Sequence, residues 1–109
     1  MELAKKRCRV CEIGVPPMSG EEEDAYFKEV PSWTLMREGV HKIKKQFRFK
    51  DFLEAISFVN KVAKIAEAEG HHPDISISYN KVVIELYTHA VKGLSENDFI
   101  IAAKIDEIE

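Results

Sequence analysis

One apolar stripe at helical spacing runs through residues 50–69, and it limits what this chain can fold into more than any other feature. The stripe predicts one long core helix over these residues. Gly70 suits the C-terminal cap of such a helix, and Pro73 cannot continue it. The apolar positions recur at steps of three and four residues: Phe52, Ala55, Ile56, Val59, Val62, Ala63 and Ala66.

A β-hairpin is predicted before this helix. Trp33 and Leu35 begin a strand-like segment, residues 37–39 form the turn, and residues 40–49 alternate as a second strand. His41 lies near the start of that strand, where we expect an exposed histidine. The alternation separates two faces: Ile43, Phe47 and Phe49 on one, and Lys44, Gln46 and Arg48 on the other.

A second hairpin is predicted after the helix. Residues 75–79 alternate apolar side chains with serine, and residues 80–81 turn the chain. Residues 82–88 return as a strand that His89 closes. The return strand has two faces: Val82, Ile84, Leu86 and Thr88 on one, and Val83, Glu85, Tyr87 and His89 on the other.

Capping signatures predict two further helices. Ser19 followed by Glu22 is a capping box, so a short helix is expected over residues 20–29 with the acidic run 21–24 as a solvated first turn. Ser95 with Asp98 three residues later predicts the N-cap of a final helix. The order α-β-β-α-β-β-α predicts an α+β fold, with helices on one face of a four-stranded antiparallel sheet.

The 109 residues are enough for one domain and too few for two. Residues 1–18 lack periodicity and are predicted to be an N-terminal arm, while residues 19–109 form the single domain. The net charge of -3 provides no field that draws the chain onto nucleic acid or anionic lipid. No apolar run follows the basic N-terminus or approaches membrane-spanning length, so we expect a cytoplasmic protein.

Two cysteines, Cys8 and Cys11, lie close together in the arm. Their number fits a reducing compartment and argues against a disulfide framework. They would make half of a zinc knuckle, and the chain holds no second pair, so no metal is expected unless subunits share a site.

Three of the four histidines, His71, His72 and His89, lie between Glu67 and Asp98. Three imidazoles and a water can hold catalytic zinc, but adjacent histidines usually diverge and no fourth ligand has an informative spacing. The histidines can also merely cap a helix and fill a surface. Alternatively, they can act as general acid and base, with the carboxylates fixing their tautomers. The residues alone leave these three interpretations open.

The full spacing is Glu67, three residues, His71-His72-Pro73, five residues, Tyr79, nine residues, His89, eight residues and Asp98. This order resembles the signature of the pterin-4a-carbinolamine dehydratases. The similarity covers roughly residues 16 to 108, and several spaced positions are far more specific than a lone motif.

The resemblance implies the fold derived above and dehydration of a 4a-hydroxytetrahydropterin to quinonoid dihydropterin plus water, in tetrahydropterin recycling, without metal or organic cofactor. It implies that His71 and His89 form the acid–base pair, in an order left open, and that His72 positions the pterin. It also implies that four residues bind or orient the substrate: Glu67, Pro73, Tyr79 and Asp98. An aromatic residue such as Tyr79 more often packs against a hairpin than contacts a ligand.

The resemblance also implies partners. Members of the family form dimers and tetramers, and an open sheet leaves edges that need a partner. We therefore expect a homodimer or homotetramer that acts on a small-molecule pterin, with no nucleic-acid or membrane partner. The alternative is a non-catalytic dimerisation module, because vertebrate members also serve as a dimerisation cofactor of a homeodomain transcription factor. The intact histidine set favours catalysis.

Overall fold

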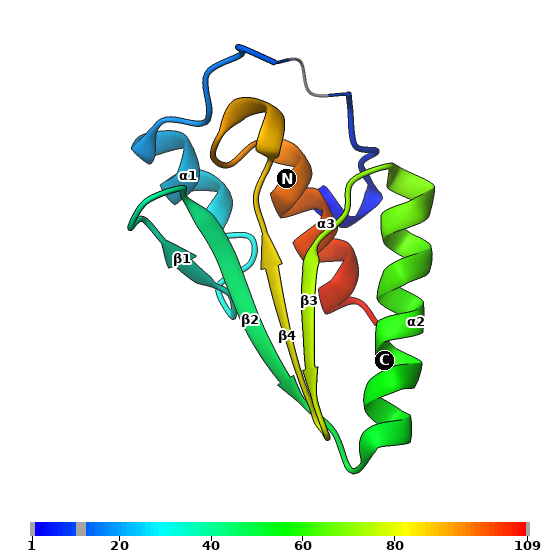
Figure 1. Ribbon diagram of the computed structural model, residues 1–109. Coiled ribbons are helices and arrows are strands. Elements are labelled where there is room, and N and C mark those ends of the chain that lie inside the picture. Colours follow the sequence, from blue (N-terminus) through cyan, green and yellow to red (C-terminus); the bar gives the residue numbers. More distant parts are fainter. Residues whose placement is uncertain (1, 11–12, 109) are drawn as a thin grey trace.

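The computed structural model describes residues 2–10 and 13–108, in which three α-helices pack on a four-stranded antiparallel sheet (Figure 1). The predicted order α-β-β-α-β-β-α is confirmed, with two added 3₁₀ turns. Within the described residues, no helix has both the length and the apolar character to cross a membrane. The elements are η1 (Leu3–Lys5), α1 (Gly20–Phe27), β1 (Thr34–Met36), β2 (Lys42–Arg48), α2 (Phe52–Glu69), β3 (Asp74–Ser78), β4 (Lys81–Leu86), η2 (His89–Val91) and α3 (Glu96–Asp106).

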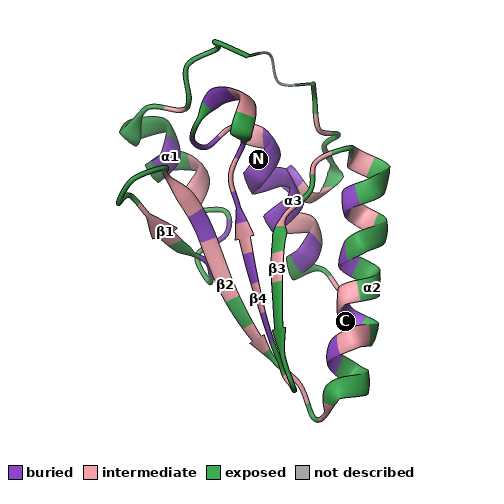
Figure 2. Ribbon diagram, in the orientation of Figure 1, coloured by how far each residue is buried: buried purple, intermediate pink, exposed green. Residues whose placement is uncertain are grey.

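The sheet has the strand order β1-β2-β4-β3, so the two predicted hairpins lie side by side and β2 pairs with β4. In this pairing Ile43 lies opposite Leu86 and Phe47 lies opposite Val82. Residues an even number of positions apart on a strand share a face, so all four of these side chains lie on the face that the helices cover. Ile43, Val82 and Leu86 are fully buried there, and Figure 2 shows the buried positions alternating along β4.

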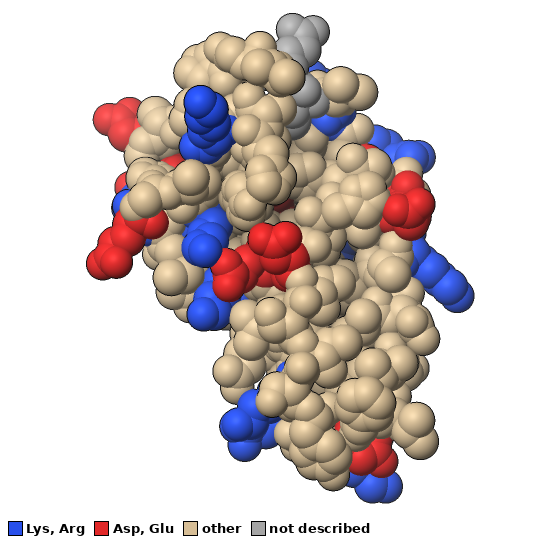
Figure 3. Space-filling model, in the orientation of Figure 1, with Lys and Arg blue, Asp and Glu red and all other residues tan. Residues whose placement is uncertain are grey.

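The other face of the sheet is turned away from the helices. It carries the ion pair between Lys42 of β2 and Glu85 of β4, with the nitrogen and oxygen 2.7 Å apart. Lysine, arginine and acidic side chains are interspersed on the side of the molecule drawn in Figure 3. No single sign of charge dominates that side.

The long helix predicted for residues 50–69 is confirmed as α2, but the predicted stripe is only partly its buried face: Ala55, Val62 and Ala66 are buried, Phe52 and Ala63 are exposed, and Phe58 is buried although it was not predicted. The four buried residues of α2 face the sheet and α3. Trp33 is 2% exposed, as expected of a core aromatic, and its indole N–H donates to Asp106 Oδ1 at 3.0 Å. The long helix, the first hairpin and α3 therefore share one core.

The segment predicted as an arm packs on this core where it is described. Leu3 of η1 is 2% exposed and belongs to the core cluster. Lys104 of α3 donates through Nζ to the carbonyl of Ala4 at 2.8 Å, and the Met18 N–H donates to the Leu94 carbonyl. The arm is thus tied to α3 and to the loop before it, both before residue 11 and after residue 12.

The first helix differs from the prediction at its end and in its burial. The capping box of Ser19 and Glu22 is confirmed, but α1 ends at Phe27 because the chain turns there to bury Val30. The acidic run is not all solvated. Glu23 is fully buried and is bonded by Arg37 and His41.

The two side chains that bind Glu23 come from the first hairpin. Arg37 Nε lies 2.9 Å from one carboxylate oxygen and His41 Nδ1 lies 2.7 Å from the other. His41 is therefore a half-buried partner of α1, rather than the exposed histidine that was expected. The sequence did not reveal this pairing because the partners lie 14 and 18 residues away on another element.

Two boundaries of the second hairpin also differ. Ser78 pairs with Lys81, so the turn is Tyr79-Asn80 and Tyr79 has a left-handed φ of 54° instead of ending the strand. The last strand ends at Leu86, and His89 begins η2 rather than closing the strand. The reason is a backbone bridge between Thr88 and Gly93, which folds residues 89–92 into a closed loop.

Gly70 ends α2 with a φ of 67°, and no atom lies within 4 Å of the position a Cβ would take. We predict that Gly70→Ala lowers the free energy of unfolding by about 1–2 kcal/mol, because an L-residue is strained in that conformation. Gly70→Asn is the matched control, since asparagine tolerates left-handed φ better than alanine. Urea unfolding tests this, and equal stability of the alanine, asparagine and wild-type proteins would contradict it.

Candidate active site

The centre of the candidate site is the contact between His71 and Asp98. Gly70 turns the chain out of α2, the His71 N–H still donates to the Ala66 carbonyl, and the imidazole points toward the first turn of α3. His71 Nε2 lies 2.6 Å from Asp98 Oδ1. The His71 side chain is 11% exposed and that of Asp98 is fully buried. The structure thus joins two predicted site residues that are 27 positions apart.

The second oxygen of Asp98 has two donors of its own. Thr88 Oγ1 donates to Oδ2 at 2.8 Å, and the Ser95 N–H donates to it at 3.0 Å within the predicted capping box. Both oxygens of this carboxylate, at the N-terminus of α3, thus have hydrogen-bond partners. A carboxylate can only accept, so the proton in the contact belongs to His71 Nε2. Nδ1 is then the ring atom that can exchange a proton.

Thr88 and Ser95 belong to this network, although the sequence did not assign them to the site. Their hydroxyl oxygens are 2.8 Å apart, and Thr88 is 4% exposed. The signal was present: a polar residue stood on the strand face otherwise made of Val82, Ile84 and Leu86. A buried hydroxyl there needs a partner, but the sequence does not say which one.

His72 turns to a different carboxylate. Its Nε2 lies 2.6 Å from Glu67 Oε1, and the two side chains are 60% and 79% exposed. An ion pair with this exposure stabilises a fold by only about 0–1 kcal/mol. The contact can therefore orient the ring of His72 without fixing it.

His89 is the first residue of η2, and its side chain is exposed. Its ring lies 4.5 Å from the ring of Tyr87, at an angle of 56°. The chain alternates here, because Thr88 between them is buried against Asp98. The hydrogen bonds that begin at His71 therefore end one residue before His89. Tyr87 is a contact of a predicted site residue that the sequence did not single out.

Pro73 and Tyr79 lie at opposite ends of β3. Pro73 directly follows His72, whereas Tyr79 is in the turn after the strand and is 66% exposed. The five residues of β3 separate them by about 17 Å of extended chain. Within one chain, Tyr79 is thus remote from the histidines, and its role in the site stays a prediction.

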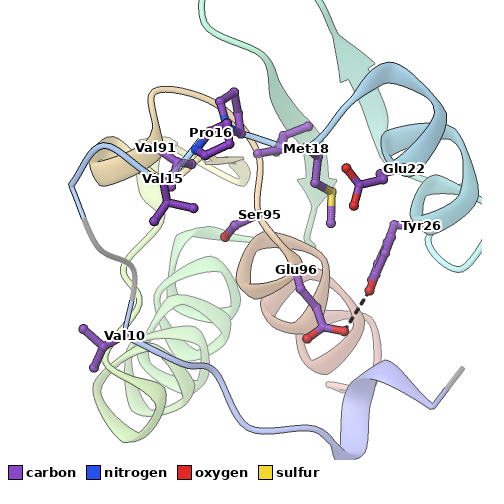
Figure 4. A pocket seen from close by; sticks show the side chains of 11 residues that line it. Val10, Val15, Pro16, Met18, Glu22, Tyr26, Val91, Ser95 and Glu96 are labelled. Atoms are coloured by element: carbon purple, nitrogen blue, oxygen red, sulfur yellow. Dashed lines mark hydrogen bonds between the residues drawn. The ribbon is translucent and has the colours of Figure 1, made fainter.

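A cavity of about 490 Å³ is lined by Ser95 and by residues of the arm, α1 and α3. Figure 4 shows Tyr26 of α1 and Glu96 of α3 meeting in its wall, where the tyrosine hydroxyl donates to Glu96 Oε2 at 2.9 Å. Burial and this carboxylate raise the pKa of Tyr26, while the Lys6 ammonium holds the pKa of Glu96 below its usual value. The other lining residues are mostly apolar: Val10, Val15, Pro16, Pro17, Met18, Glu22, Val91, Leu94 and Ser95.

Metal ligation was one of the interpretations left open by the sequence. Within residues 2–10 and 13–108, no three His, Cys, Asp or Glu side chains are grouped so that they could hold a metal ion. Cys11, one half of the expected cysteine pair, lies outside the described residues. Its partner Cys8 is half-buried and donates its backbone N–H to Glu69 Oε1 at 2.8 Å.

Glu69 is the last residue of α2, and its side chain is 7% exposed. Besides the Cys8 N–H, Arg7 Nε lies 3.1 Å and Lys104 Nζ lies 3.8 Å from its Oε2. Burial acts to raise the pKa of Glu69. The Cys8 N–H, Lys104 and Arg7 outweigh that effect and hold the pKa below the usual value.

Comparison with known proteins identifies the family. Residues 16–108 match the family described as pterin 4 alpha carbinolamine dehydratase. The chain belongs to this pterin dehydratase family. A relative from Methylococcus capsulatus, named "Putative pterin-4-alpha-carbinolamine dehydratase", is 46% identical over 106 residues, which cover 97% of this chain and 92% of the relative. One of the same name from Rubrobacter xylanophilus is 43% identical and covers 98% of both chains.

Solved structures of pterin dehydratases agree with the fold. The transcriptional coactivator/pterin dehydratase from Brucella melitensis superposes with a TM-score of 0.77 at 30% identity, covering 83% of this chain and 95% of its own. A pterin dehydratase-like protein described as a RuBisCO assembly factor in the alpha-carboxysome gives 0.59 at 25% identity, covering 69% and 86%. The family resemblance inferred from the spaced residues is therefore confirmed.

For the network around Asp98, we predict that Thr88→Val lowers the free energy of unfolding by about 2 kcal/mol, because the buried carboxylate loses a donor while the side-chain shape is kept. Thr34→Val, the same change on the exposed edge strand β1, should stay within about 0.5 kcal/mol of wild type. Denaturant unfolding measures both. Equal effects at the two positions would mean that the Thr88 hydroxyl does not stabilise Asp98.

For Glu69, we predict a pH-dependent stability difference. Because its pKa is lowered on folding, the charge stabilises the protein above about pH 4.5, and this contribution is lost as the pH falls through the folded-state value. Glu69→Gln should cost about 2 kcal/mol at pH 7 and progressively less below pH 4.5. Glu2→Gln, at an exposed pair, is the control. A difference between Glu69→Gln and wild type that is constant with pH would contradict the assignment.

Proposed function

We propose that this protein is a 4a-hydroxytetrahydrobiopterin dehydratase, which converts a pterin 4a-carbinolamine to quinonoid dihydropterin and water. The names of its relatives supply the substrate class. The observation that carries the proposal is the contact of His71 Nε2 with the buried Asp98, which fixes one tautomer of a half-enclosed imidazole. A histidine held in this way is suited to proton transfer at neutral pH.

The reaction has two proton tasks. The C4a–O bond breaks as an acid protonates the departing hydroxyl, which leaves as water. A base removes the proton from N5, and its electron pair forms the C4a=N5 bond. One proton is given and one is taken, so the reaction needs no oxidant or reductant. The protein has to supply only an acid, a base and a fixed position for the pterin.

We assign the two proton tasks to His71 and His89. For His71, the Asp98 carboxylate orients the ring through Nε2 and leaves Nδ1 for proton exchange with substrate. His89 is exposed, which leaves its ring available to a substrate. His72, oriented by Glu67, would position the pterin together with Pro73, and Tyr79 remains a candidate contact. Either histidine can be the acid, depending on which face of the pterin carries the hydroxyl.

We also propose that the protein works as a homodimer or homotetramer. β3 is an edge strand of an open sheet, and its residues Ser76, Ile77 and Ser78 are exposed. Such an edge invites pairing with another chain unless it is protected. The second candidate function is a non-catalytic binding module, which the coactivator and assembly-factor descriptions of the two solved relatives favour.

The test is stopped-flow absorbance of 4a-hydroxytetrahydropterin decay. We predict acceleration by wild type and a loss of kcat of at least about 100-fold in His71→Gln, because glutamine can keep the donor to Asp98 but cannot titrate. His89→Phe, which keeps the ring against Tyr87, should lose a similar factor. His41→Asn is the control, since its amide can replace the Nδ1 donor to Glu23 far from the site.

Circular dichroism and unfolding curves establish that each variant is folded. A folded wild type that leaves the decay rate unchanged would reject the dehydratase and favour the binding module. Acceleration that survives in both His71→Gln and His89→Phe would retain the reaction but reject the histidine pair.

A further inference from the structure

The described arm contacts both α2, whose end is followed by His71, and α3, which carries Asp98. On one side it binds the end of α2. The Cys8 N–H donates to Glu69 Oε1 at 2.8 Å, and Arg7 Nη2 donates to the Ala68 carbonyl at 3.3 Å. Glu69 lies two residues before His71. The Glu69 side chain is only 7% exposed, so its hydrogen bond with the Cys8 N–H is shielded from water, unlike a surface ion pair.

On the other side the arm binds the start of α3. The Arg9 N–H donates to Asn97 Oδ1 at 2.9 Å, and Asn97 Nδ2 donates back to the Arg9 carbonyl. The amide of Asn97 thus pairs with one residue of the arm in the way a neighbouring strand would. Asn97 is 5% exposed and directly precedes Asp98.

We propose that Arg7, Cys8 and Arg9 are a clamp that holds α2 against α3 and so sets the His71–Asp98 contact, with Glu69 and Asn97 as positioning residues. As far as it concerns catalysis, this inference rests on the proposed dehydratase function. The clamp spans two consecutive peptide units, at Cys8 and Arg9, and each end binds a buried side chain. Neither Glu69 nor Asn97 needs to touch the substrate for the clamp to act.

Other contacts of the arm would anchor it without serving as a clamp. Leu3 fills the core, Lys104 binds the Ala4 carbonyl, and Lys6 pairs with Glu96. These contacts tie the arm to α3 and the core, and Lys104 Nζ also lies 3.8 Å from Glu69 Oε2 of α2. The contacts of Arg7 and Cys8 with Glu69 and Ala68 complete the bridge. The bridge can therefore be broken while the arm stays attached.

Two variants break the α3 side of the bridge, one at each of its two partners. Arg9→Pro removes the backbone N–H that donates to Asn97, and Asn97→Leu removes the amide while filling similar space. Arg9→Ala is the matched control, because it deletes the same side chain as proline does and keeps the N–H. We expect kcat to fall about tenfold in each bridge variant with KM within about twofold, since small misplacements of a catalytic group lower the rate strongly. Arg9→Ala should lose clearly less than Arg9→Pro, because both variants delete the side chain, which acts electrostatically on Glu96, and only proline also deletes the N–H.

Two further readouts separate positioning from loss of fold. The double variant Arg9→Pro/Asn97→Leu should lose no more than either single variant, because both break the same bridge. In proton NMR, the His71 Nε2–H in a short contact with a carboxylate should resonate far downfield, and His71→Gln assigns that signal. The resonance should move upfield or broaden in the bridge variants but not in Arg9→Ala.

Each outcome decides the proposal. Folded bridge variants with unchanged kcat and an unchanged His71 resonance would overturn it, as would equal losses in Arg9→Pro and Arg9→Ala. Additive losses in the double variant would also overturn it, because they would mean separate effects. If wild type has no dehydratase activity, the NMR comparison still tests the clamp, so failure of the function and failure of the clamp are distinguishable.

Discussion

The arrangement of the molecule depends on one buried carboxylate. Asp98 has no exposed surface, and a charge in that position is tolerated only where donors replace its water. His71, Thr88 and the Ser95 N–H are those donors. They come from the end of α2, the segment after β4 and the N-cap of α3. The same carboxylate therefore joins the long helix, the sheet and the last helix at the end of the molecule where the histidines lie.

The two adjacent histidines make similar contacts with carboxylates that differ in burial. His71 and His72 each place Nε2 2.6 Å from a carboxylate oxygen, but Asp98 is buried and Glu67 is 79% exposed. Water screens the exposed pair, whereas little water reaches the buried one. His71 is consequently held in one tautomer and orientation, while His72 remains adjustable. This difference agrees with the roles proposed for them, proton transfer for His71 and contact with the pterin for His72.

Much of the fold could be predicted from local patterns. The period of residues 50–69 indicated α2, and Gly70 indicated its end. The capping boxes at Ser19 and Ser95 predicted the starts of α1 and α3, because each capping box joins two residues only three positions apart. The alternation of apolar residues located both hairpins. The pairing of β2 with β4, which joins the hairpins, has no local signature and could not be read in the same way.

The site was harder to predict because its polar partners are distant in the sequence. Spacing singled out His71 and Asp98, but Thr88 was seen only as a position on a strand face. Glu23 was read as solvated because its partners belong to another element. A side chain's burial depends on the whole fold, whereas its neighbours in the chain determine only its local conformation. Polar residues on apolar faces are therefore where sequence analysis most needs the structure.

The proposed clamp follows from the geometry of successive residues in a helix. Side chains one position apart point about 100° away from each other. On α3, Asp98 faces His71 while Asn97, one step earlier, faces the arm; at the end of α2, Glu69 faces the arm while His71 lies beyond the Gly70 turn. One side chain cannot point both toward the site and toward the arm. The His71–Asp98 pair and the residues that bind the arm, Glu69 and Asn97, are therefore different but nearby positions of the chain. Asn97 is one residue from Asp98 and Glu69 is two residues from His71. Because these connections are so short, a displacement of the arm should be transmitted to the His71–Asp98 contact.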